Sequence, residues 1–338
     1  MNLLNRYILR NFGHSFFPIF SALFLIMSVA FFIQISVQTS YLKVSLGEIL
    51  ELYLYYVPEL LLYTMPVSFF AAGVISLSKL SFDLELIVLF ALQGSVKHLM
   101  KPLGMIAGLM MVILLITGLW LKPKAMLMSK ELIYKKEDTS QLNLKPSEYG
   151  QKFGNWLLHV EKKYDDRNYG NLIMFSRQKN NDIIVKAEKG TIEQSKGYFN
   201  LLLSRGETYS IGSDGIKEIR FEEMRVNEKS NITKLHFTDV IDFWKEWVER
   251  RNPRDLSSAI LTALFPILSL LMIVSTGVIN PRHQKNRSSF YVIILITFYY
   301  AMTYGFGDKY PLYSLFVVPP MWLGLSYLMY YFRIRGKY

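Results

Sequence analysis

Long apolar segments alternate with short polar connectors along most of the chain. Three such segments precede residue 122 and three follow residue 255, and each is close to or above the roughly 20 residues that a membrane-spanning helix needs. Pro58 and Pro66 interrupt the second segment, which a spanning helix tolerates where neighbouring helices satisfy its backbone. The pattern therefore predicts a helical membrane protein with three spans on each side of a polar insertion. The predicted spans are Phe12–Val37, Ile49–Leu77, Pro102–Leu121, Leu256–Ile279, Phe290–Phe306 and Leu312–Phe332.

The polar insertion, from about Lys124 to Arg254, has the pattern of a β domain. Five short apolar stretches are separated by turn-forming residues such as Ser213-Asp214-Gly215, which is typical of a sandwich, barrel or jelly roll. The fold class we expect is therefore six membrane helices, three plus three, around an inserted all-β, jellyroll-like domain. The predicted domains are 1–122, 123–254 and 255–338. The five predicted strands are Trp156–Val160, Leu172–Phe175, Ile183–Lys186, Tyr198–Leu203 and Ile216–Phe221.

The stretch between the second and third spans predicts a short helix at the membrane surface, about residues 81–99. Ser81 followed by Asp83 and Glu85 suits a helix start, because an N-cap serine and acids favour the positive end of the helix dipole. Many of the next residues are apolar, and Lys97 and His98 suit the other end. Such a helix needs a partner for its exposed apolar side. Either the membrane interface or another protein can supply it.

Composition and charge narrow the class of protein. The chain is 51% hydrophobic, has a net charge of +11 and contains no cysteine, so it has no disulfide and no thiolate metal site. A positive net charge suits binding to nucleic acid or to an anionic membrane. The apolar segments favour the membrane. Lysine and arginine gather in the N-terminal segment, residues 79–101, residues 282–287 and the C-terminal tail. We expect these parts to be cytoplasmic and the β insertion to lie outside.

Catalytic chemistry is not indicated by the sequence. The five histidines have no metal-ligand spacing, and neither a phosphate-binding glycine loop nor a nucleophile elbow is present. Glu59, an acid inside a span, is either a shallow structural residue or a functional one. A set of basic residues at the outer ends of the spans is either ordinary solvated charge or a collar for anionic phosphates. This predicted collar consists of Lys43, Lys122, Lys124, Arg250, Arg251, Arg254 and Lys309.

Several local motifs resemble one family. They are RYILRN at 6–11, VPELLLYTMPVSFFAAGVISLSKL at 57–80, VKAEKG at 185–190, LLLSRGE at 201–207 and VVPPMW at 317–322. Together with the three-plus-three layout, they resemble the LptF/LptG permeases (the YjgP/YjgQ family), the membrane subunits of the ABC transporter that exports lipopolysaccharide. The Val57-Pro58-Glu59 motif slightly favours LptF over LptG. The family tends to have an Ala-x-Gly-x-Ser pattern after its glutamate. Here Ala91, Gly94 and Ser95 occur, with the glycine one place later.

The resemblance implies a role for the short surface helix. Glu85 matches the family's glutamate that engages the ATPase, whereas the residues alone fit an ordinary acid at a helix start. The implied ATPase-coupling residues are Phe82, Asp83, Glu85, Leu86 and Leu89. The basic collar and Glu59 are the residues implied for substrate binding.

The implied function is an ATP-driven extractor that takes lipopolysaccharide from the inner membrane through the periplasmic β domain towards the outer membrane. The implied partners are a cytoplasmic LptB-like ATPase dimer, a second LptF/LptG-type permease and an LptC/LptA-like periplasmic bridge, with no nucleic acid. The chain itself would bind no cofactor or metal and would not be an enzyme, because the partner uses the ATP. The location would be the bacterial inner membrane, with both termini cytoplasmic.

A second hypothesis is a membrane-anchored sensor or scaffold whose external β domain binds a ligand. Six spans favour a transporter, because an anchor needs fewer. A membrane-embedded enzyme is a third hypothesis, for which no group of candidate residues exists. Co-purification of an ATPase would separate the first hypothesis from the other two.

Overall fold

The computed structural model describes most of the chain, and it divides into two compact units. A helical unit comprises Met1–Phe31, Leu54–Met126 and Phe237–Tyr338, and a β unit comprises Phe32–Tyr53 and Leu127–His236. The described residues are 3–39, 44–91, 96–139, 151–153, 156–165, 168–177, 181–195, 198–212, 215–229, 240–246, 254–279 and 287–334.

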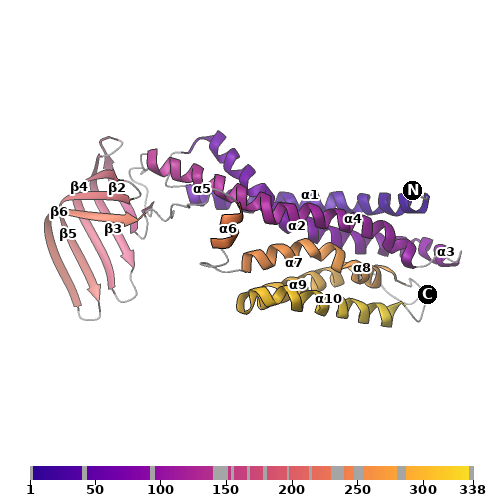
Figure 1. Ribbon diagram of the computed structural model, residues 1–338. Coiled ribbons are helices and arrows are strands. Elements are labelled where there is room, and N and C mark those ends of the chain that lie inside the picture. The colour runs from indigo at the N-terminus through magenta and orange to yellow at the C-terminus, as the bar shows by residue number, and fades with distance from the viewer. Residues whose placement is uncertain are drawn as a thin grey trace. The chain divides into compact units, whose positions relative to one another are not determined.

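The predicted spans all fall on helices (Figure 1). Among the described residues, five helical segments are long and apolar enough to cross a membrane, and a pair of helices bent by 47° would make a sixth span. The fold class, membrane helices with an inserted β domain, is confirmed. The helices are α1 (Leu3–Thr39), α2 (Leu46–Phe82), α3 (Glu85–Ala91), α4 (Val96–Ile116), the π-helical turn η1 (Thr117–Leu121), α5 (Lys122–Thr139), α6 (Val240–Glu246), α7 (Arg254–Leu268), α8 (Leu270–Gly277), α9 (Ser288–Lys309) and α10 (Pro311–Arg333).

The fourth predicted span is the bent pair α7 and α8. Pro266 lies inside α7 and has no N–H to donate, which weakens the helix just before its end. The break falls at Ser269, whose hydroxyl accepts a hydrogen bond from the indole N–H of Trp322 in α10 at 3.0 Å. Ser269 and Trp322 are both fully buried. The bend between α7 and α8 is therefore in contact with α10 through this hydrogen bond.

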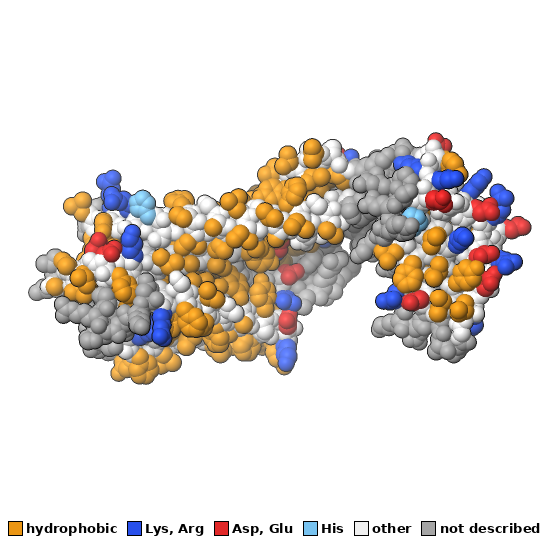
Figure 2. Space-filling model, turned by 180° about the vertical axis from the view of Figure 1, so that it is seen from behind, with side chains coloured by type: hydrophobic (Ala, Val, Ile, Leu, Met, Phe, Trp, Pro, Cys, Tyr) orange, Lys and Arg blue, Asp and Glu red, His pale blue; other side chains and the backbone are white. Residues whose placement is uncertain are grey.

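An aromatic cluster forms the centre of the helical unit. The ring of Phe265 in α7 lies 4.4 Å from Tyr299, 5.5 Å from Phe70 and 6.0 Å from Trp322, centroid to centroid, and all four side chains are fully buried. Between membrane-spanning helices, close packing of this kind holds the helices together, because lipid tails are as apolar as the side chains. Away from this core, hydrophobic side chains cover much of the surface of the helical unit (Figure 2). A hydrophobic exterior is what a lipid environment favours.

The β unit contains one antiparallel sheet. Each strand pairs with the next along the chain, so the sheet order is β1 to β6 and the described strands form a meander. All five predicted strands are confirmed and are longer than predicted, and the short β1 was not predicted. The strands are β1 (Gln151–Phe153), β2 (Trp156–Lys163), β3 (Asn168–Arg177), β4 (Asn181–Ser195), β5 (Tyr198–Gly212) and β6 (Gly215–Lys229).

The pairing of β2 to β6 is interrupted along one line. Glu161, Asn171, Glu188, Arg205 and Glu222 each lack a pairing partner while their neighbours on both sides are paired. The φ angles of Asn171 and Arg205 are 52° and 51°, in the left-handed region. The buried apolar side chains on the two sides of this line belong to one core, which requires the sheet to bend there.

Candidate functional site

The short helix α3 is separated from α2 by a tight turn. The sequence placed its start at Ser81, but α2 continues through Phe82 and α3 begins at Glu85. Between them, the N–H of Leu84 donates to the Ser81 carbonyl at 3.1 Å, and Leu84 has a φ of 62°. Because this left-handed conformation interrupts the right-handed helix, α2 and α3 are separate helices.

One side of α3 packs on the bundle and the other is open. Leu86 is buried in the core of the helical unit, and Leu89 packs against that core. Leu84 and Val88 are 48% and 58% exposed, and Glu85 is also exposed. This exposed apolar pair, Leu84 just before α3 and Val88 within it, was not predicted as part of the site. The open side of α3 therefore carries two aliphatic side chains next to a carboxylate.

Glu85 has a partner from the beginning of the chain. The hydroxyl of Tyr7 in α1 donates a hydrogen bond to Oε2 of Glu85 at 2.6 Å. This O–H to carboxylate bond joins residues 78 positions apart and ties α3 to the first turns of α1. The first turns of α1, α3 and the last turn of α10 lie at the same end of the helical unit, which we call the α3 end (Figure 1).

The opposite end, the α6 end, holds two ion pairs. Nζ of Lys122 lies 2.9 Å from Oε1 of Glu59, and both side chains are about one-quarter exposed, at 28% and 26%. Arg254 pairs with Asp308, and its guanidinium lies 5.4 Å from the ring centroid of Tyr304. Two cations of the predicted collar therefore already have a carboxylate, so an incoming anion would have to compete with Glu59 and Asp308.

The remaining collar residues are placed differently from one another. Nζ of Lys124 lies 5.1 Å from the ring centroid of Trp120, and Lys309 is exposed at the end of α9. The other three, Lys43, Arg250 and Arg251, lie outside the described residues. Sequence reasoning did not select Asp308, although an acid at the end of a predicted span marks it as a candidate.

The π-helical turn η1 is a junction at the α6 end. The N–H of Lys122 donates to the carbonyl of Thr117, five residues back, so the turn is wider than an α-turn. The carbonyl of Leu119 accepts a hydrogen bond from the indole N–H of Trp244 in α6 at 2.8 Å. Helix α6, which precedes the second set of spans, is therefore fastened to the end of the third span.

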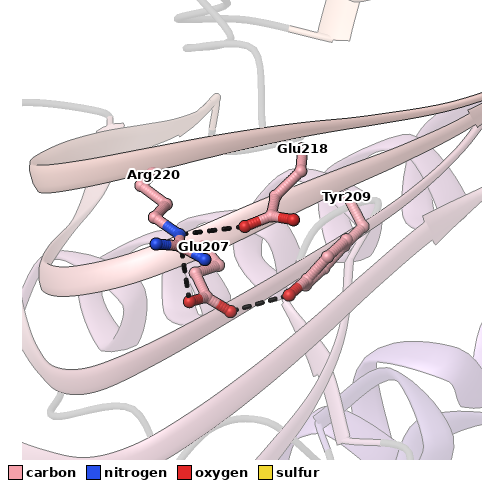
Figure 3. A network of polar contacts seen from close by, with 4 residues as sticks. All are labelled: Glu207, Tyr209, Glu218 and Arg220. Atoms are coloured by element: carbon pink, nitrogen blue, oxygen red, sulfur yellow. Dashed lines mark hydrogen bonds and ion pairs between the residues drawn. The ribbon is translucent and has the colours of Figure 1, made fainter.

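A polar network lies on the exposed face of β5 and β6 (Figure 3). Nε of Arg220 lies 2.9 Å from Glu218 and 3.5 Å from Glu207, and the Tyr209 hydroxyl donates to Glu207 at 2.7 Å. These partners raise the pKa of Arg220 and the pKa of Tyr209, through the hydrogen bonds to Glu218 and Glu207 respectively. A cavity of about 360 Å³ lies beside Arg220 and Glu207. Because its charges are paired, the network is best explained as cross-strand stabilisation of the sheet.

The comparison with known proteins shows the family of the chain. The family described as lipopolysaccharide export system permease LptF/LptG matches residues 6–332 of the 338. The chain belongs to the LptF/LptG family. This permease is thus a multi-pass membrane protein of the lipopolysaccharide export system and not an enzyme. The family match includes both LptF and LptG. No curated protein matches the chain with significance.

The structure groups the predicted site residues of the permease at its two ends. Phe82 is half-buried, Asp83 and Glu85 are exposed, and Leu86 and Leu89 face the bundle at the α3 end. The described collar residues and Glu59 lie at the α6 end. In the described part of the chain, no group of three or more His, Asp or Glu side chains could hold a metal ion.

Proposed function

We propose that the permease is one membrane half of an ATP-driven lipopolysaccharide extractor. Its α3 end docks on a cytoplasmic LptB-like ATPase dimer, and a second LptF/LptG-type permease completes the membrane cavity. Lipopolysaccharide leaves the inner membrane and passes along the β unit in the periplasm to an LptC/LptA-like bridge. The chain binds no cofactor, since the partner binds and hydrolyses the ATP. Family membership and the geometry of the two ends support this proposal.

The exposed side of α3 is the observation that carries the proposal. A helix of seven residues is not stable in isolation, so its surroundings must hold it in place. Leu86 and the Tyr7–Glu85 bond attach one side to the bundle, and Leu84 and Val88 remain exposed. A protein groove with an apolar floor and a nearby cation is complementary to these side chains.

The distribution of charge supports a cytoplasmic α3 end. Arg6 and Arg10 begin the chain and Lys97 and Lys101 begin α4, so basic residues gather at this end without an equal number of acids. At the α6 end, Lys122 and Arg254 flank the long polar insertion, and long inserted segments are largely exempt from the rule that basic residues mark the cytoplasmic side. The bias of lysine and arginine therefore favours the α3 end as the inner one.

The α6 end supplies a site where phosphate groups can exchange with carboxylates. Lysine and arginine bind phosphate well, and a doubly charged phosphate attracts them more strongly than a single carboxylate does. We assign the exchanging pairs to Lys122 with Glu59 and Arg254 with Asp308. Ion pairs of this kind keep the cations in position before the lipid arrives and leave no unpaired charge at the membrane surface.

A pull-down from detergent extracts tests the proposed function. Wild-type permease is expected to bring down an ATPase, and Glu85→Arg is expected to lose it, because the reversed charge repels the partner's cation and breaks the Tyr7 bond. Asp242→Arg is the matched control, since Asp242 is an exposed acid in α6 at the other end. Folded wild-type protein that brings down no ATPase would favour the sensor or scaffold instead.

A further inference from the structure

Helices α2 and α8 are in backbone contact near the α3 end. A Cβ atom on Gly277 would lie 2.7 Å from Cβ of Leu77, and one on Gly73 would lie 2.8 Å from Cγ2 of Ile273. Both distances are shorter than side-chain contacts allow, so a larger residue at either position would force its neighbour to shift. Because the two glycines have no side chain, α2 and α8 pack closely here, and close packing resists sliding of one helix past the other.

Ser81, in the last turn of α2, joins this contact with hydrogen bonds. Its hydroxyl is 1% exposed. The O–H group is shared between the carbonyl of Leu77 at 2.9 Å and that of Gly277 at 3.2 Å, and Oγ accepts the N–H of Ile279 at 3.1 Å. The end of α8 has backbone groups with no partner in its own helix. Ser81 satisfies one of them, the carbonyl of Gly277, and it also accepts the N–H of Ile279, which follows the helix.

A second serine holds the beginning of α9 to the same turn. The hydroxyls of Ser78 and Ser288 are 2.7 Å apart, and both residues are buried. The last turn of α2 therefore holds the end of α8 through Ser81 and the start of α9 through Ser78. Together, these residues form what we call the α2 joint: Ser78, Ser81, Gly277, Ile279 and Ser288.

The α2 joint lies between α3 and the bent span. Glu85, at the start of α3, follows Ser81 after a single tight turn. On its other side the joint holds α8, which meets α7 at the 47° bend. Helix α7 begins at Arg254, in one of the ion pairs of the α6 end. A displacement of α3 that moves α8 would change this bend and shift Arg254 relative to Asp308.

We propose that Ser81 is a positioning residue that couples movement of α3 to the bend between α7 and α8, and so to the lipid-binding ion pairs. This inference rests on the proposed function, because it takes α3 as the ATPase contact. The α2 joint moves as one body, and the bend at Ser269 is the element that changes. The hydroxyl of Ser81 fixes α8 to α2 in both states.

The test uses the whole complex, permease with its ATPase and second permease, in proteoliposomes that contain lipopolysaccharide from the host's outer membrane. ATP hydrolysis and lipopolysaccharide release are both measured, and their ratio is the readout. Ser81→Ala is expected to retain ATPase binding and ATP turnover, while lipopolysaccharide released per ATP falls by about threefold or more, as for other losses of coupling. Ser81→Thr, which keeps the hydroxyl, is expected to retain most of the ratio.

Ser76→Ala is the matched control, because Ser76 is a buried serine of α2 whose hydroxyl donates to Gly73 in its own helix. An unchanged ratio in an intact Ser81→Ala complex would overturn the inference. Failure of wild type to bind any ATPase would instead overturn the proposed function. If the Ser81→Ala permease does not assemble with its partners, a second variant tests the inference. In that variant the α2 joint is locked instead of broken.

The locked variant is the double substitution Ser78→Cys with Ser288→Cys. The natural chain has no cysteine, and the two hydroxyl oxygens are close enough for a disulfide in their place. If the α2 joint moves as one body, the oxidised complex keeps the wild-type ratio. If oxidation stops release while ATP is still hydrolysed, α2 must move against α9, and the inference is wrong.

Discussion

The hydrogen bond between Tyr7 and Glu85 makes a prediction about ATPase binding. Helix α3 has a single fully buried side chain, Leu86, so few contacts fix its orientation. Tyr7→Phe keeps the ring and removes the O–H that donates to Glu85. Without this bond α3 samples more orientations, and the partner must order it on binding. We therefore expect the variant to bind the ATPase more weakly.

The structure limits the size of this effect. The bond is short and ends on a carboxylate, but Tyr7 is 39% exposed, so water competes for both groups. A net contribution of about 0.5–1 kcal/mol is appropriate for such a bond. Since 1.4 kcal/mol corresponds to a tenfold change in Kd, the expected loss is about two- to fivefold.

A titration of the isolated ATPase against permease in lipid nanodiscs measures this change. Tyr313→Phe serves as the control, because Tyr313 is an exposed tyrosine at the opposite end of the bundle. Glu85→Gln keeps an acceptor for Tyr7 but removes the charge, and the double variant shows whether the two losses are independent. An affinity that rises in Tyr7→Phe would refute the reasoning, because Tyr7 would then be a competitor of the ATPase.

Three further predictions concern other parts of the helical unit. Gly277→Ala should lower the free energy of unfolding by about 1–3 kcal/mol through overpacking, seen as a lower Tm, whereas Gly108→Ala, with open space around it, should not. Trp244→Phe should lower the Tm by removing the donor to the π-turn carbonyl, at about 1 kcal/mol, and an unchanged Tm would mean that water replaces the indole. Glu59→Gln should increase lipopolysaccharide retention in detergent, because Lys122 loses its competing carboxylate, and reduced retention would contradict the exchange.

The membrane spans were predictable because they depend mainly on one property, the length of an apolar segment. A bilayer requires about 20 apolar residues, and this can be counted along the sequence. The bend in the fourth span was not predictable in the same way, although Pro266 lies nearby. Its position at Ser269 depends on the hydrogen bond from Trp322, which is 53 residues away. Local sequence carries no information about that contact.

In the β unit, too, local features were predictable from the sequence and long-range pairing was not. Alternating apolar residues and turn signals placed five strands correctly, since both are local properties. The predicted strands were too short because polar residues beyond their predicted ends, such as Glu222 and Glu223, weaken the apolar signal without ending the strand. The line of interrupted pairing through Asn171 and Arg205 depends on cross-strand register, which local patterns do not encode.

The candidate site was predictable in its residue types and not in its pairings. The resemblance to the LptF/LptG permeases pointed to Glu85, and basic residues at span ends pointed to Lys122 and Arg254. Their partners Tyr7 and Asp308 lie far away in sequence, 78 residues in the case of Tyr7. Only the packing of the helices brings these groups together.

The π-helical turn at Thr117–Leu121 also has a consequence for comparing this permease with its relatives. A π-turn contains one residue more than the α-turn it replaces, and each residue rotates a helix by about 100°. Deleting one residue here would therefore turn the start of α5 by about that angle. Lys122 would then point away from Glu59, with its sequence neighbours unchanged. In this family, a single-residue gap at this position would separate permeases that share this ion pair from those that place the cation on a different side of the helix.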